Sequence, residues 1–340
     1  MNNYKKIGIS ALAGSLAMVS ANALEYTMGG ELASTFTSAK GNTTAEAGKG
    51  FGTETDLTFT ATGELENGWT VTSFMGVDTA SNLTNSSSQV TIGMGSLGTI
   101  RLNHIGGSSA NGMDDVMPNA YQETWDGLSD GTNPSFFGAA TASGSIEYRM
   151  PEMESNGMTV NASILYDPSS SGANTVRGVG TDAVSGNAYT ATASHEIGIS
   201  AGVGYETVDD SQGITTAGAG NTSASTGYIK YAYGPITLGY QQAYNNLRHG
   251  GAIAEAGDSE ATMSAIAYTA GNLTVSYGES ELKTVAVSNT ASTSIDLDSI
   301  QAAYVMGAMT ISAAISETAN SGGVAGATHE ENTLAVSFAF

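Results

Sequence analysis

The chain has 340 residues, of which 44 are Gly and none is Cys, and only 12% carry a charge, whereas roughly 25% is usual in soluble globular proteins. Its 32 acidic and 10 basic residues give a formal net charge of −22, which argues against nucleic acid or an anionic membrane surface as a partner. Without Cys, the chain can form neither disulfides nor thiolate metal sites.

Residues 1–23 have the three-part pattern of a secretory signal peptide. Lys5 and Lys6 precede an apolar run over residues 7–19, and Ala21-Asn22-Ala23 ends it with small residues. We predict cleavage after Ala23. The alternative, a first helix that stays in the mature protein, is less favoured because the run is apolar on all sides. Cleavage removes two Lys and no acids, so residues 24–340 carry 32 acids and 8 bases, a net charge of −24.

The rest of the chain alternates between apolar and polar residues with a period of two, as β-strands do. At the C-terminus one face carries Leu334, Val336, Phe338 and Phe340, and the other carries small or polar residues. The pattern recurs over residues 158–167 and 197–206. Each segment has about ten residues, the length that a tilted strand needs to cross a bilayer. Beyond residue 23, no run of about 18 apolar residues is present to cross as a helix.

Sixteen candidate strands follow one another, at 24–37, 54–65, 68–79, 88–95, 98–105, 141–150, 157–167, 187–194, 197–207, 224–233, 236–246, 259–270, 272–283, 294–306, 308–318 and 329–340. Their connections alternate between short turns, such as Glu66-Asn67, Gly234-Pro235, Gly271 and Gly307, and long polar loops, of which the first covers residues 38–53. Seven short turns therefore lie at one end of the sheet and eight long loops at the other.

This organisation predicts an all-β fold, a transmembrane antiparallel β-barrel of 16 strands with short periplasmic turns and long extracellular loops. Lipid offers no hydrogen-bond partners, so a sheet that crosses it must close on itself. Sixteen strands enclose a water-filled channel, which accounts for the polar inner positions. We expect no strand to place a charge on its apolar, lipid-facing side.

Residues 24–340 resemble the trimeric sixteen-stranded Gram-negative porins. The resemblance rests on the terminal Phe340 with its apolar partners, on the hairpin over residues 63–71 and on the segment over residues 90–102. It implies an outer-membrane location, a homotrimer, a third loop folded into the lumen and recognition of Phe340 by the barrel-assembly machinery. It also suggests trimer contacts by outward residues of the early and late strands, such as Leu32, Phe36, Phe59, Ala313 and Ile315.

The longest connection, residues 106–140, is the predicted pore constriction. It carries no Lys or Arg and contains the acids Asp114, Asp115, Glu123, Asp126 and Asp130. It also contains Trp125, Tyr121, Phe136, Phe137 and Met117, enough apolar surface to pack inside the barrel. The alternative is a solvated acidic lid that lies outside the barrel.

Scarce bases are predicted on the pore wall. The alternation places Arg101, Glu147, Arg149 and Lys230 on the inner face, where the bases and the loop acids would set up a field across the constriction. The alternative is that each base only pairs with a wall carboxylate such as Glu147. The net acidity predicts a preference for cations that weakens at high salt.

No catalytic or cofactor site is expected. Asp114, Asp115 and Asp126 offer a possible calcium site, but their spacing does not fit an EF-hand, and adjacent acids are commonly just solvated. The four His are far apart in sequence, and no Gly-x-Ser-x-Gly motif is present. The leading hypothesis is therefore a porin for passive diffusion of small hydrophilic solutes and ions, in contact with outer-membrane lipid. The alternative is an exported acidic β-rich surface or adhesion protein without a pore.

Overall fold

The computed structural model describes residues 25–42, 47–78, 84–114, 116–126, 128–129, 137, 144–168, 184–210, 222–247, 258–284 and 293–340. The strands are β1 (Glu25–Gly41), β2 (Gly48–Glu64), β3 (Thr70–Asp78), β4 (Thr84–Gly93), β5 (Thr99–Ile105), β6 (Ser145–Arg149), β7 (Met153–Ser155), β8 (Met158–Asp167), β9 (Val184–His195), β10 (Ile199–Asp210), β11 (Thr222–Tyr233), β12 (Ile236–Leu247), β13 (Ser259–Ala270), β14 (Leu273–Thr284), β15 (Ile295–Met306), β16 (Met309–Ala319) and β17 (Thr328–Ala339). Three 3-10 turns accompany them, η1 (Gly95–Leu97), η2 (Asn111–Met113) and η3 (Ser321–Gly323).

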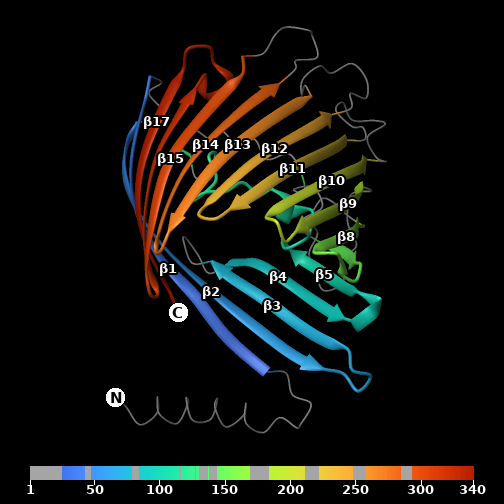
Figure 1. Cartoon of the computed structure of the whole chain (residues 1–340). Coiled ribbons are helices and arrows are strands. Elements are labelled where there is room, and N and C mark those ends of the chain that lie inside the picture. The colour runs from blue at the N-terminus through green and yellow to red at the C-terminus, as the bar shows by residue number, and fades with distance from the viewer. Residues whose placement is uncertain are drawn as a thin grey trace, which may run out of the picture.

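The strands form one closed antiparallel barrel. Apart from β6 and β7, consecutive strands pair with each other, and β1 pairs with both β2 and β17, which closes the ring. In Figure 1 the red strand β17 lies against the blue strand β1. The strands β6 and β7 both pair with β8 and are two parts of one wall strand, so the barrel has sixteen strands, as predicted. Within the described residues, no helix is long and apolar enough to cross a membrane.

Strand positions agree with the predicted ones to within a few residues in most of the wall, and two differences have a physical reason. The predicted strand 141–150 contains β6, and the wall strand resumes as β7 in the predicted turn, interrupted where Pro151 has no N–H to donate to the ladder. The predicted loop 38–53 is largely strand, since β1 continues to Gly41 and β2 starts at Gly48. Pairing of Lys40 with Glu330 and of Gly41 with His329 extends β1 beyond the apolar alternation.

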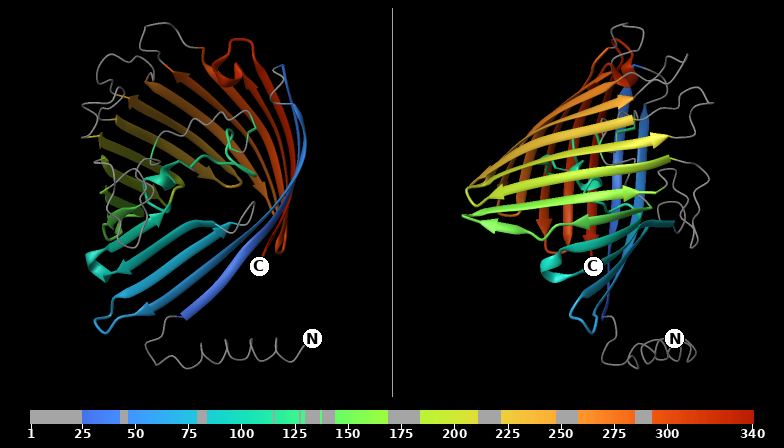
Figure 2. Two further views of the ribbon diagram at one scale, coloured as in Figure 1. Left: turned by 180° about the vertical axis from the view of Figure 1, so that it is seen from behind. Right: turned by 90° about the vertical axis from the view of Figure 1, so that its right-hand side faces the viewer.

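The short turns that join β11 to β12, β13 to β14 and β15 to β16 lie together at one end of the barrel, as Figure 2 shows. The short ones include Gly271 and Gly307, whose φ angles of +61° and +64° suit Gly, because it has no Cβ to clash in the left-handed region. The sequence signal of a lone Gly between two alternating runs therefore located these hairpins correctly.

The wall has an apolar outer face and a mostly polar inner face. On β17, Leu334 and Phe338 are 51% and 43% exposed on the outside, whereas His329 and Glu331 on the inside are 1% and 5% exposed. The same alternation runs along β8, where Ile164 and Tyr166 face out and Ser163 and Leu165 face in. Because successive side chains of a strand point to opposite faces, one pattern specifies both the lipid contact and the lining.

One expectation about the outer face is wrong. Charges do lie on the outward side of several strands, near their extracellular ends. Glu279, Asp298 and Glu317 occupy directly opposed positions on β14, β15 and β16, with Glu330 of β17 next in the row. Nearer the short turns the outward residues of these strands are apolar, such as Tyr277, Ile300 and Ile315, so the row of acids lies at one edge of the apolar face.

Candidate pore constriction

The segment after β5 enters the barrel and binds the inner wall on the far side. Its backbone is held by polar side chains of distant strands. Ala120 N–H donates to Ser276 Oγ at 2.9 Å, and Tyr121 N–H donates to Gln301 Oε1 at 3.0 Å. Gln301 Nε2 returns a bond to Gln122 O at 2.6 Å, and Gln241 Nε2 donates to Met113 O at 2.8 Å. Met113 and residues 120–122 of the third loop are therefore inside the barrel, against β12, β14 and β15.

Apolar contacts support this position. Trp125, Val116 and Met117 of the loop are 3%, 8% and 6% exposed and pack against inward residues of the wall, Ala243, Ala261, Met263 and Leu297. A second cluster joins Ala110, Met113 and Phe137 of the loop to Leu165, Ala188 and Ala224. An inner wall that only faced water would not carry Leu and Met at these positions. The loop thus has a hydrophobic core of its own, formed with half of the barrel lining.

Ser129, further along this segment, is fixed to β17. Ser129 donates to Glu331 Oε2 from its N–H at 3.1 Å and from its hydroxyl at 2.7 Å. His329 Nε2 lies 3.2 Å from the same carboxylate oxygen, and the His329 side chain is fully buried. This pair was not predicted from the sequence.

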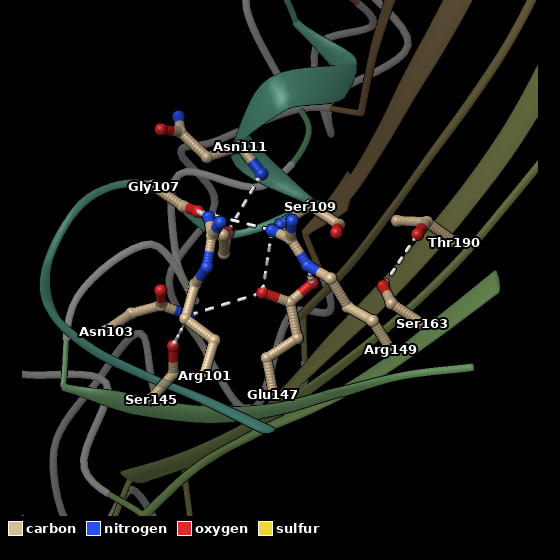
Figure 3. A network of polar contacts seen from close by, with 11 residues as sticks. Arg101, Asn103, Gly107, Ser109, Asn111, Ser145, Glu147, Arg149, Ser163 and Thr190 are labelled. Carbon is tan, nitrogen blue, oxygen red and sulfur yellow. Dashed lines mark hydrogen bonds and ion pairs between the residues drawn. The ribbon is translucent and has the colours of Figure 1, made fainter. Parts of the chain in front are cut away.

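The first residues of the loop are fixed to β5 and β6 by a charged group, shown in Figure 3. Glu147 is fully buried. Its Oε1 accepts the N–H of Ser109 at 3.0 Å and lies 3.1 Å from Arg149 Nε, and its Oε2 accepts Arg149 Nη2 at 3.1 Å. Arg101 and Arg149 both donate to the carbonyl of Gly107. Arg149 therefore binds the carboxylate, both guanidinium groups share the Gly107 carbonyl, and the two bases and one acid leave the group with a net positive charge.

Lys230 lies apart from these arginines. It faces inward from β11, half-buried, with Nζ 5.6 Å from the centre of the Tyr228 ring, a cation–π distance. Tyr228 also packs against both apolar clusters of the loop.

The predicted loop acids have different surroundings. Glu123 is 3% exposed, and its Oε1 accepts the N–H of Met117 at 2.7 Å, so this carboxylate holds the loop backbone. Asp126 accepts the N–H of Glu123 at 3.3 Å, and Asp114 follows η2 in a half-buried position. Asp115 and Asp130 lie outside the described residues.

A group of acids on the opposite wall was missed. Glu31, Glu54, Asp56 and Asp78 face inward from β1, β2 and β3, where Glu31 is opposite Asp56 and Asp56 is opposite Asp78. Glu31 and Glu54 are exposed, so water reaches this part of the lining. Burial raises the pKa of the Tyr121 phenol above its usual value, and the negative charge of Glu31 raises it further. The alternation of Glu54 and Asp56 with Leu57 and Phe59 was the available signal.

Comparison with known proteins identifies the family. A sequence model described as Gram-negative porin matches residues 8–340. The chain belongs to the Gram-negative porin family. Its place is accordingly the bacterial outer membrane. No match was found among curated protein sequences.

Solved structures agree on the fold. The porin superposes on a loop L8 deletion mutant of OmpT, an outer membrane protein of Vibrio cholerae, with a TM-score of 0.68 and 11% identity over 94% of this chain and 100% of the other. A porin refined at 1.8 Å gives a TM-score of 0.65 with 18% identity over 93% and 100% of the two chains. A mutant of Rh. blastica porin gives 0.58 with 15% identity and the same coverage. At these identities the likeness shows the sixteen-stranded fold alone.

The porin offers one described cluster of acids close enough to share a cation. One carboxylate oxygen each of Glu54, Asp56 and Asp78 lies within 4.8 Å of the others. Asp114 and Asp126, which the sequence suggested for calcium, are not part of it. The sequence suggested a cation site in the third loop. The close acids lie instead on two wall strands, β2 and β3, and the register between these strands places Asp56 opposite Asp78.

Proposed function

We propose that this porin is a passive channel for small hydrophilic solutes and ions and that it prefers cations. The observation that carries the proposal is the division of the lining. The loop covers the inner face of β12 to β15 and binds β17, whereas the acids of β1, β2 and β3 stay accessible to water. The aqueous path therefore runs between the loop and a wall with four carboxylates.

Charge on this wall acts on ions directly. Carboxylates that line a narrow aqueous path raise the local cation concentration and repel anions, and low-dielectric surroundings strengthen the effect. Arg101 and Arg149 start the loop on the neighbouring strands β5 and β6. The sequence predicted an electric field between these bases and the loop acids. We propose instead that the field runs between these bases and the wall acids of β1 to β3.

Reversal potentials test the proposal. In planar bilayers with a salt gradient near 0.1 M, where the Debye length is about 10 Å, the wild type is expected to favour K⁺ over Cl⁻. The triple variant Glu54→Gln, Asp56→Asn, Asp78→Asn is expected to reduce the permeability ratio roughly two-fold or more, because it removes charge from the path. The control Glu279→Gln, Asp298→Asn, Glu317→Gln removes three charges from the outer face. Equal effects of the two triples, or an anion-selective wild type, would reject the proposal.

We further propose a homotrimer, in contact through the outer faces of β1, β2 and β16. Leu32, Phe36, Phe59 and Ile315 are 42%, 47%, 37% and 55% exposed there, and Ala313 is exposed on the same face of β16 as Ile315. A related fold, OmpT of Vibrio cholerae, has a trimer form. Cross-linking of the detergent-extracted porin is expected to yield three-chain species, and an exclusively monomeric product would contradict the proposal.

Residues 1–23 lie outside the described residues, and their role as a cleaved signal peptide is part of the proposal. Intact mass measurement of protein from outer membranes is expected to give a chain that begins at Leu24. A mass that retains Met1 would contradict it.

A further inference from the structure

Three inward-facing glycines of the wall lie directly beneath residues of the third loop. Gly204 of β10 is beneath Phe137, Gly239 of β12 is beneath Pro118, and Gly278 of β14 is beneath Thr124. A Cβ built on any of them would approach these loop atoms to less than 3.0 Å, a distance that real Cβ contacts essentially never show.

Backbone conformation does not explain these glycines. None of the three has a φ in the left-handed region, so any L-residue could adopt their backbone. Gly inside a strand weakens it and often marks a site where another chain segment approaches closely. The absence of a side chain at these positions therefore leaves room for the loop to lie directly against the wall.

Neighbouring inward positions carry side chains that bind the loop from further away. Gln241, two residues after Gly239, reaches Met113 O, and Ser276, two residues before Gly278, accepts the N–H of Ala120. Thus on β12 and β14 a hydrogen-bonding side chain alternates along the inner face with a glycine. The first fixes the loop laterally, and the second lets it lie against the wall.

We propose that Gly204, Gly239 and Gly278 are positioning residues that set the distance between the third loop and the wall and, through it, the cross-section of the aqueous path. The inference rests on the channel function proposed above. The loop is bound at its start by Arg101 and Arg149 and further on by Glu331, so a side chain beneath its middle displaces it toward the acid-lined wall. A narrower path and a lower conductance follow.

The contact between Gly278 and Thr124 gives the sharpest test, because both partners can be changed. Gly278→Ala is expected to lower the single-channel conductance roughly two-fold, since its Cβ would meet the Thr124 hydroxyl and overpacking displaces neighbouring side chains and backbone. Thr124→Ala removes the hydroxyl that the new Cβ would meet, so the double variant is expected to return to the wild-type conductance. Cation preference is expected to stay unchanged in all three, because no charge is altered.

The matched control is Gly227→Ala on the outer face of β11. A Cβ there meets nothing closer than 3.8 Å, so its conductance is expected to equal that of the wild type. Folding of each variant is checked by heat-modifiable gel mobility. If Gly278→Ala does not fold, Thr124→Ile crowds the same contact from the loop side and leaves the wall unchanged.

The outcomes separate the two proposals. A wild type without conductance rejects the channel itself. A conducting wild type together with folded Gly278→Ala of equal or higher conductance, or with a double variant that stays low, overturns the role of the glycines alone. If Thr124→Ile is used instead, unchanged conductance overturns it.

Discussion

Removal of the Glu147 charge is expected to destabilise the barrel more than any single change of a surface acid. Glu147 is fully buried, and its two oxygens bind Arg149 and the N–H of Ser109. In Glu147→Gln the side chain keeps its size, but one oxygen becomes an N–H₂ group that faces donors. Arg101 and Arg149 then converge on Gly107 O without a counter-charge.

The magnitude follows from burial. Breaking a fully buried ion pair by removal of one partner costs about 3–5 kcal/mol. The Arg149 side chain is 31% exposed, so water screens part of its charge, and we expect a loss of about 2–3 kcal/mol in the free energy of unfolding. Denaturant unfolding of the refolded barrel in detergent measures this loss, with the exposed Glu154→Gln as the control within about 0.5 kcal/mol of wild type.

A double-mutant cycle decides whether charge is the cause. Glu147→Gln combined with Arg149→Met removes both charges and is expected to recover at least half of the loss, because replacement of both partners of a buried pair is often nearly neutral. If Glu147→Gln costs no more than Glu154→Gln, or if the second change adds its own full cost, the ion pair does not fix the start of the loop.

Two further changes test the ends of the structure. Gly30→Val is expected to reduce the yield of heat-modifiable barrel, because a Cβ at Gly30 would meet Asp56 O and the Phe340 ring where β1 joins the C-terminus. Gly48→Val is the control, since nothing lies within 4 Å of a Cβ built at Gly48. Equal yields of the two variants would contradict the reasoning. Glu331→Gln is expected to lower the free energy of unfolding by about 1–3 kcal/mol and to increase the current noise of the open channel, since Ser129 loses a charged acceptor. The adjacent outward Glu330→Gln is the control and is expected to leave the noise unchanged. Noise that does not differ between the two would show that Ser129 needs no charged acceptor.

Local pattern was sufficient for the wall and insufficient for the loop. The alternation around Leu334 and Phe338 fixes which face meets lipid, because strand geometry ties it to sequence with no further information. The same rule places Arg101, Glu147 and Arg149 on the inner face. It does not predict that Glu147 binds Ser109, because that contact depends on the path of the loop.

The carboxylate of Glu123 likewise was expected to face solutes, but it accepts the N–H of Met117, six residues earlier. Pairing of Asp56 with Asp78 needed the register of β2 and β3, which turn residues around Asn67 and Gly68 determine.

The outward acids define where the lipid contact ends. Glu279, Asp298 and Glu317 are directly opposed on consecutive strands, an arrangement of like charges that is unfavourable even in water. Below this row the outward residues are apolar, with Ile300 61% exposed on β15. Because a Lys costs about 2–4 kcal/mol at mid-membrane and little near the surface, Ile300→Lys is expected to cost about 2 kcal/mol of unfolding free energy in lipid vesicles. Asp296→Lys, on the same strand and face beyond the row, is expected to cost nothing measurable. Equal costs at the two positions would show that the row does not mark the edge of the lipid.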